Sequence, residues 1–185
     1  MSELKHLGNK DLLKLPKTAF LASNTISSEI VLRCYDWATE MRRQGRCVIS
    51  GFSSKLEKDV LHFLLKGEQP VIIVLARQMY KVVPVDLKEA LEQNRLLIIS
   101  TSNAARQSRA TALARNRYVC EMAEQIVLVG TDASLGLRSL AEAFRGKTCE
   151  MVRSHEENEK NAGGGAENSR YNPVNLQDNK LLWGE

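Results

Sequence analysis

Short runs of mostly apolar residues, separated by helical segments, constrain the fold of this chain more than any other feature. Residues 71–75 read VIIVL and residues 96–100 read LLIIS, and neither run alternates with polar residues. A strand of this kind is buried on both faces, as in a parallel sheet that helices cover on both sides. The sequence therefore predicts an α/β protein in which each strand is followed by a helix.

Six runs fit such strands, and helical patterns lie between them. The predicted strands are residues 18–22, 46–50, 71–75, 96–100, 125–129 and 148–152. Apolar residues that recur every three or four positions predict helices over residues 27–44, 55–66, 84–94, 115–123 and 137–145. Right-handed crossovers place such helices on both faces, so we expect a Rossmann-like, doubly wound, mainly parallel sheet.

One domain accounts for most of the 185 residues. We expect an N-terminal helical lead-in over residues 1–17, which Pro16 ends, and the Rossmann-like domain over residues 18–153. Residues 154–185 begin as a polar, charged, glycine-rich stretch, which is typical of a linker. They end in a short apolar tail at residues 181–183, which we expect to dock either on its own domain or on a second copy in a homodimer.

Charge and cysteine content narrow the class of protein. The formal net charge is +4 and the pI is about 8.9, which permits nucleic-acid binding without requiring it. The four cysteines lie far apart, and no histidine stands at ligand spacing from them, so we expect reduced buried thiols, no metal and no cofactor. No apolar run suits a membrane span or a secretion signal, so we expect a cytoplasmic protein without a membrane partner.

Polar and small residues follow most of the predicted strands. In an open parallel sheet the ligand site lies at the carboxyl ends of the strands, and helix starts there bind phosphate through free N–H groups. The residues that we expect to form this phosphate-binding edge are Ser23, Asn24, Gly51, Phe52, Ser53, Ser54, Ser100, Thr101 and Ser134. Each of these loops could also serve only to cap the helix that follows it.

Arginines concentrate before the fifth predicted strand. Within twelve residues the chain carries Arg106, Arg109, Arg115, Asn116 and Arg117. If a helix begins at residue 115, Arg115 and Arg117 oppose its dipole, and a bound anion would resolve that conflict. An ion pair between Arg117 and Glu121 on the helix surface is the alternative. We expect the four arginines to contact phosphate groups of a nucleic acid or nucleotide.

Motifs of common nucleotide enzymes and hydrolases are missing from the sequence. There is no G-x-G-x-x-G, no P-loop motif, no serine elbow and no zinc-protease motif. Glu57 and His62 lie on a predicted helix, where structural or solvated side chains are the simpler interpretation. Because no catalytic set emerges, a binding protein is favoured over an enzyme.

Three segments resemble the DNA-processing protein A (DprA) family, part of a Rossmann-like group that includes the LOG nucleotide-processing proteins. Residues 48–52 (VISGF) resemble the family's turn after the second strand, and residues 114–129 resemble its R-N-R helix and the following strand. Residues 133–135 resemble the turn before its last core helix. The resemblance covers about residues 18–152 and implies a single-stranded DNA-binding module.

Several family positions differ here. Residues 22–24 (ASN) stand in place of the family's G-S-R, and Ser54 and Glu57 stand in place of an arginine and an aspartate. The P-G-G-x-G-T motif of LOG proteins is missing as well. The main hypothesis is therefore a DprA-like module with an arginine-lined edge. The alternative is a small-nucleotide binding or sensing protein, or a diverged nucleotide-processing enzyme.

Overall fold

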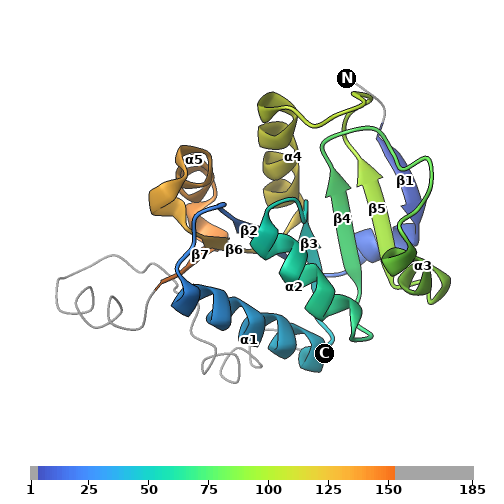
Figure 1. Cartoon of the computed structure of the whole chain (residues 1–185), viewed down its shortest axis with the longest axis horizontal. Coiled ribbons are helices and arrows are strands. Elements are labelled where there is room, and N and C mark those ends of the chain that lie inside the picture. Colours follow the sequence, from blue (N-terminus) through green and yellow to red (C-terminus); the bar gives the residue numbers. More distant parts are fainter. Residues whose placement is uncertain (1–3, 153–185) are drawn as a thin grey trace.

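A twisted sheet runs through the middle of the protein, and helices cover both of its faces (Figure 1). The computed structural model describes residues 4–152. Its strands are β1 (Lys5–Gly8), β2 (Lys17–Ala22), β3 (Cys47–Ser50), β4 (Val71–Leu75), β5 (Leu96–Ser100), β6 (Gln125–Val129) and β7 (Thr148–Met151). They lie in the order β1-β5-β4-β3-β2-β6-β7, and within the described residues β1 alone pairs antiparallel. The predicted linker and the tail at residues 181–183 lie outside the described residues.

The segment before β2 differs from the predicted helical lead-in. It forms β1, which pairs with the outer edge of β5, and then a single 3-10 helix, η1 (Lys10–Lys14). Gly8 joins the two at a φ of 103°, and a Cβ there would lie 2.2 Å from the carbonyl oxygen of Leu96. The prediction of a packing helix is wrong because pairing with a strand ninety residues away outweighs a partial helical pattern.

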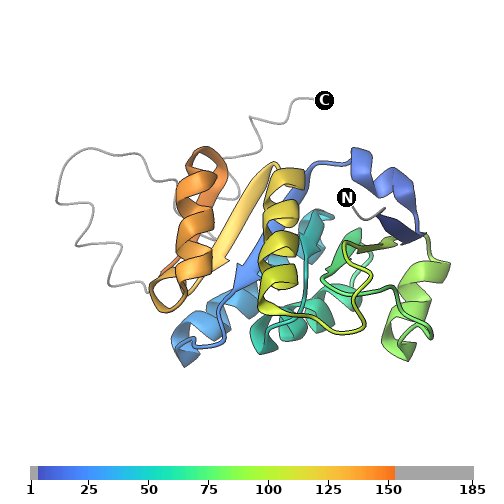
Figure 2. The same ribbon diagram turned by 90° about the horizontal axis from the view of Figure 1, so that it is seen from above.

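The helices divide into two layers (Figure 2). In chain order they are α1 (Ser28–Gln44), α2 (Lys55–Leu65), α3 (Val85–Glu92), α4 (Arg109–Met122) and α5 (Leu135–Ala143). The first three bury their apolar sides on one face of the sheet, where Trp37 stacks on Phe20 with ring centroids 4.8 Å apart. The last two cover the other face, where the core is mostly aliphatic. Between residues 4 and 152, no helix is long and apolar enough to span a membrane.

β2 and β6 are parallel neighbours in the sheet, but the helices that follow them lie on opposite faces of it. The chain leaves β2 for α1 on one face, whereas it leaves β6 for α5 on the opposite face. Strands whose connections diverge in this way leave a crevice at their carboxyl ends, and α/β proteins bind ligands there. The α/β class and the doubly wound, mainly parallel sheet are therefore confirmed, and the sheet itself locates a candidate site.

Candidate functional site

The carboxyl ends of β2 and β6 meet at Ser23 and Gly130. The N–H of Ser23 donates to the carbonyl of Val129 at 2.9 Å. Gly130 has a φ of 77°, and a Cβ on it would lie 2.4 Å from the Oγ of Ser23. A cavity of about 1090 Å³ opens beside this contact, with Thr25 and Arg138 in its wall. The close approach of the two loops therefore depends on a glycine at residue 130.

Helix α4 begins at Arg109, not at residue 115, and this changes the position of the arginines. Ser108 caps it, because its Oγ accepts from the N–H of Thr111 at 3.1 Å while its own N–H donates to the Thr111 hydroxyl at 2.9 Å. Arg115 and Arg117 therefore lie in the middle of the helix, and the predicted conflict with its dipole is wrong. Alanines at three of the residues 110–114, after a capping serine, were the signal for the earlier start.

Arg115 turns inward and is only 2% exposed. Its guanidinium donates to the hydroxyl of Ser53 at 3.0 Å and to the carbonyl of Val74 at 3.3 Å, and its Nε donates to the Oδ1 of Asn116 at 2.7 Å. The guanidinium fits because residue 51 is glycine, since a Cβ there would lie 2.2 Å from the Cζ of Arg115. Arg115 therefore ties α4 to the β3–α2 loop and to the end of β4.

A buried carboxylate, Glu57, completes this internal support. It accepts hydrogen bonds from three backbone N–H groups, those of Ala22 at 2.9 Å, Ser53 at 2.8 Å and Ser54 at 3.3 Å. Burial lowers the pKa of Arg115, and the negative charge of Glu57 opposes that decrease. Glu57 thus joins the end of β2 to the start of α2, which the Ser54 hydroxyl caps.

Three of the predicted arginines are exposed, in contrast to Arg115. Within residues 4–152, Arg106 and Arg109 have no hydrogen-bond or ion-pair partner. Arg117 pairs with Glu121 at 3.1 Å, as the alternative interpretation predicted, and its guanidinium lies 5.7 Å from the centroid of the Phe144 ring. No aspartate or glutamate occurs between residues 93 and 120. The positive charge at the start of α4 is therefore not neutralised by its own segment.

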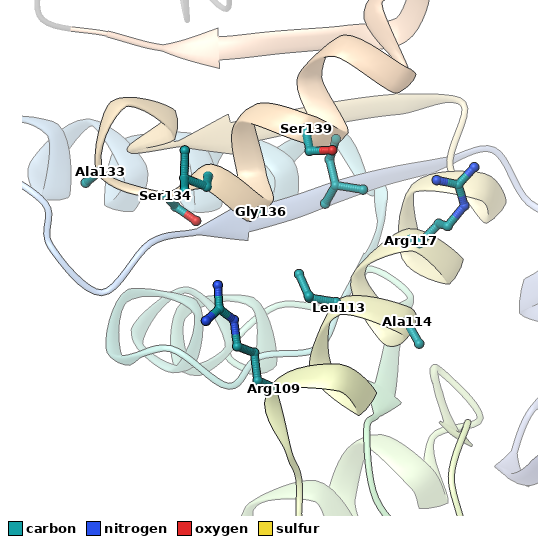
Figure 3. Close-up of a pocket in the computed structure, with 10 residues that line it drawn as sticks. Arg109, Leu113, Ala114, Arg117, Ala133, Ser134, Gly136 and Ser139 are labelled. Carbon is teal, nitrogen blue, oxygen red and sulfur yellow. The ribbon is translucent and has the colours of Figure 1, made fainter.

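A groove of about 810 Å³ lies between α4 and α5 (Figure 3). Arg109 extends from the start of α4 toward the start of α5, where Ser134 caps the helix by accepting from the N–H of Leu137 at 3.3 Å. Leu113 and Leu135 line the groove and are 46% and 73% exposed. The groove thus combines a positive end with accessible apolar side chains.

Other predicted residues shape the loops from inside. The Ser100 hydroxyl donates to the carbonyl of Arg77 at 2.8 Å, and the Thr101 hydroxyl donates to the carbonyl of Leu75 at 2.9 Å. Phe52 is buried, with a φ of 47°. Asn24, by contrast, is exposed at the end of β2. The predicted set therefore separates into buried residues that hold the edge together and exposed residues that a ligand can reach.

The sequence places Arg77 and Tyr80 at the predicted edge, but neither was among the residues assigned to the phosphate-binding site. Both lie in the loop after β4, and the Arg77 guanidinium lies 4.8 Å from the centroid of the Tyr80 ring. The N–H of Gln78 donates to the carbonyl of Ala104 at 2.8 Å, which joins this loop to the one that leads to Arg106. The signal was available, since Arg77 stands two residues after β4 at the same edge of the sheet.

Comparison with known proteins gives one family and a shared fold. The family model of DNA recombination-mediator protein A matches residues 3–163. No curated protein sequence matches the chain. The structure of DNA processing protein A from Helicobacter pylori is similar at 19% identity with a TM-score of 0.69, over 97% of this chain and 86% of that one. The protein of the same name from Streptococcus pneumoniae is 17% identical with a TM-score of 0.65, over 98% and 66% of the two chains.

Proposed function

Because the chain belongs to the DNA recombination-mediator protein A family, we propose that it binds single-stranded DNA. The family match confirms the resemblance that the turn at residues 48–52 and the R-N-R element predict. The solved structure of the Helicobacter pylori protein concerns the single-stranded DNA binding mode of that protein. In this chain, the observation that carries the proposal is the exposed pair Arg106 and Arg109 at the start of α4.

The position of α4 presents this pair to a strand that lies across the sheet edge. Arg115 bonds to the carbonyl of Val74 near the end of β4. At 1.5 Å per residue, the six residues before Arg115 extend α4 about 9 Å farther. Figure 1 shows these first turns beyond the arrowheads of β4 and β5. An anion there also meets the positive end of the helix dipole and its free N–H groups.

We propose different roles for the four predicted arginines. Arg106 and Arg109 contact phosphates directly. Arg109 and Arg117 both line the groove between α4 and α5, whereas Arg106 lies in the loop before α4. Arg115 contributes indirectly, because it holds the β3–α2 loop and fixes the position of α4. Leu113 and Leu135 offer apolar surface to the sugars and bases of a strand in the groove between α4 and α5.

The salt dependence of binding tests this assignment. For single strands, each neutralised phosphate contributes about 0.7 to the slope of log affinity against log salt concentration. We expect Arg106→Ala/Arg109→Ala to weaken binding of a labelled oligo-dT and to reduce the slope by about 1.4, measured by fluorescence anisotropy. Arg43→Ala is the control, since Arg43 is also exposed but pairs with Glu40 in the last turns of α1. An unchanged slope in the double variant, or no binding by the wild type at low salt, contradicts the proposal.

A small-nucleotide ligand is the second candidate, and the cavity of about 1090 Å³ beside Ser23 and Gly130 favours it. Such a ligand would raise the melting temperature of the protein, whereas oligonucleotides would leave it unchanged. We also retain the proposals of a cytoplasmic location and a homodimer. Measurement of the mass in solution, with and without residues 181–183, tests the homodimer.

A further inference from the structure

The loop after β4 carries the chemistry of a base-binding site. Within residues 76–84, the Arg77 guanidinium lies over the ring of Tyr80 at 4.8 Å from its centroid. We propose that the Arg77–Tyr80 pair stacks against one unpaired base of the bound strand. This inference rests on the proposed function, and it adds a base contact to phosphate contacts that are made elsewhere.

Two hydrogen bonds to its backbone hold the loop of Arg77 and Tyr80 in place before any ligand arrives. The carbonyl of Arg77 accepts from the Ser100 hydroxyl at 2.8 Å. The N–H of Gln78 donates to the carbonyl of Ala104 at 2.8 Å, only two residues before Arg106. A strand whose phosphates lie on Arg106 and Arg109 therefore passes close to the Arg77–Tyr80 pair. Because the loop backbone is already held, it loses little conformational entropy when a base binds there.

The surroundings suit a flat, uncharged ring. Val82 and Val85 are 79% and 77% exposed, so the start of α3 offers apolar surface next to the pair. No acidic side chain occurs in residues 76–84. Proteins that bind single strands stack bases on aromatic rings and on guanidinium planes, and a guanidinium held over an aromatic ring presents both.

The other aromatic side chains near the edge do not fit this role. Phe52 is only 5% exposed and packs in the core below α1 and α2. Tyr118 is half-buried on α4 and packs against the opposite core layer. Tyr80 is also half-buried and packs partly against the core under α1 to α3, but unlike Tyr118 it carries an arginine over its ring and lies in a loop at the sheet edge.

The test compares two strands of equal length and charge, an oligo-dT and its abasic sugar–phosphate counterpart. We expect the wild type to prefer the oligo-dT. Tyr80→Ala should weaken oligo-dT binding roughly fivefold or more, the range measured for loss of one base stack, and leave abasic binding and the salt slope unchanged. Tyr80→Phe keeps the ring and should bind like the wild type. Arg77→Ala should also weaken oligo-dT binding and leave the salt slope unchanged, because its guanidinium contacts a base and not a phosphate.

The outcomes separate this inference from the proposed function. If the wild type binds oligo-dT and Tyr80→Ala binds it equally well, the base site is refuted and single-strand binding stands. Equal losses for both strands also refute the site, since they show that Tyr80 supports the fold or the charge pattern. If the wild type binds neither strand, both proposals fail.

Discussion

Replacement of Arg115 by alanine distinguishes a structural arginine from one that contacts the ligand. The substitution leaves the Val74 carbonyl and the Ser53 hydroxyl without their donor, in a site where Arg115 itself is 2% exposed. A buried polar group without a partner costs about 1–3 kcal/mol. Glu57 also loses a nearby positive charge, although its three backbone donors remain. We therefore expect the free energy of unfolding to fall by about 3 kcal/mol.

Thermal and urea unfolding, followed by circular dichroism, measure this loss. For a protein of this size, about 3 kcal/mol corresponds to a decrease in melting temperature of roughly 6–12 °C. Arg117→Ala is the control two residues away on the same helix. Its side chain is 62% exposed and its guanidinium pairs with the half-exposed Glu121, so its removal should cost less than about 1 kcal/mol.

The structural role of Arg115 is refuted if Arg115→Ala melts within about 2 °C of the wild type and still loses its affinity for oligo-dT. That result would show that the guanidinium leaves its internal contacts to bind the ligand. If the structural role is right, Arg115→Ala at a temperature where it is folded retains the salt slope of the wild type.

Three further predictions concern the glycines and the thiols. Gly130→Ala should lower the free energy of unfolding by about 1–3 kcal/mol, because its φ of 77° and the contact with Ser23 disfavour a side chain; an unchanged urea midpoint contradicts this. Gly51→Ala should displace the Arg115 guanidinium, so Gly51→Ala/Arg115→Ala should cost less than the sum of the single changes, and strict additivity would argue against the contact. Burial raises the pKa of the thiols of Cys34, Cys47 and Cys120 to about 12. DTNB should therefore label the native protein slowly at pH 8 and rapidly after unfolding, and fast labelling of the native protein would contradict their burial. Because folding raises these pKa values from 9.0, the stability that these thiols contribute is present below pH 9 and is lost as the pH rises toward 12.

The inner strands could be read from the sequence because burial on both faces leaves an unbroken apolar run. β4, β5 and β6 begin and end at the predicted residues. β1 could not be read in this way, since none of its four residues is fully buried and its partner lies far along the chain. An edge strand of this kind is specified by its partner and not by its own pattern.

The start of α4 escaped prediction for a different physical reason. Its first turns extend past the sheet and bury little, so they lack the apolar periodicity by which a helix is found. Capping and the helix propensity of alanine form these turns instead. The burial of Arg115 was equally hidden, because arginine is usually exposed and its site depends on Gly51, a residue distant in sequence.

The order of the strands also determines when the sheet can be completed on the ribosome. β2 pairs with β3 along one edge and with β6 along the other. The second edge stays unpaired during synthesis, because Gln125, the partner of Thr18 in β6, is made about a hundred residues later. Until α4 and α5 emerge, the nascent sheet shows an open strand edge and a bare apolar face that includes Ile49, Ile72 and Val74. Pairing between such distant segments is slow, and exposed edges of this kind aggregate. Helices α4 and α5 thus also cover an apolar face that, in a partly made chain, would be open to chaperones or other nascent chains.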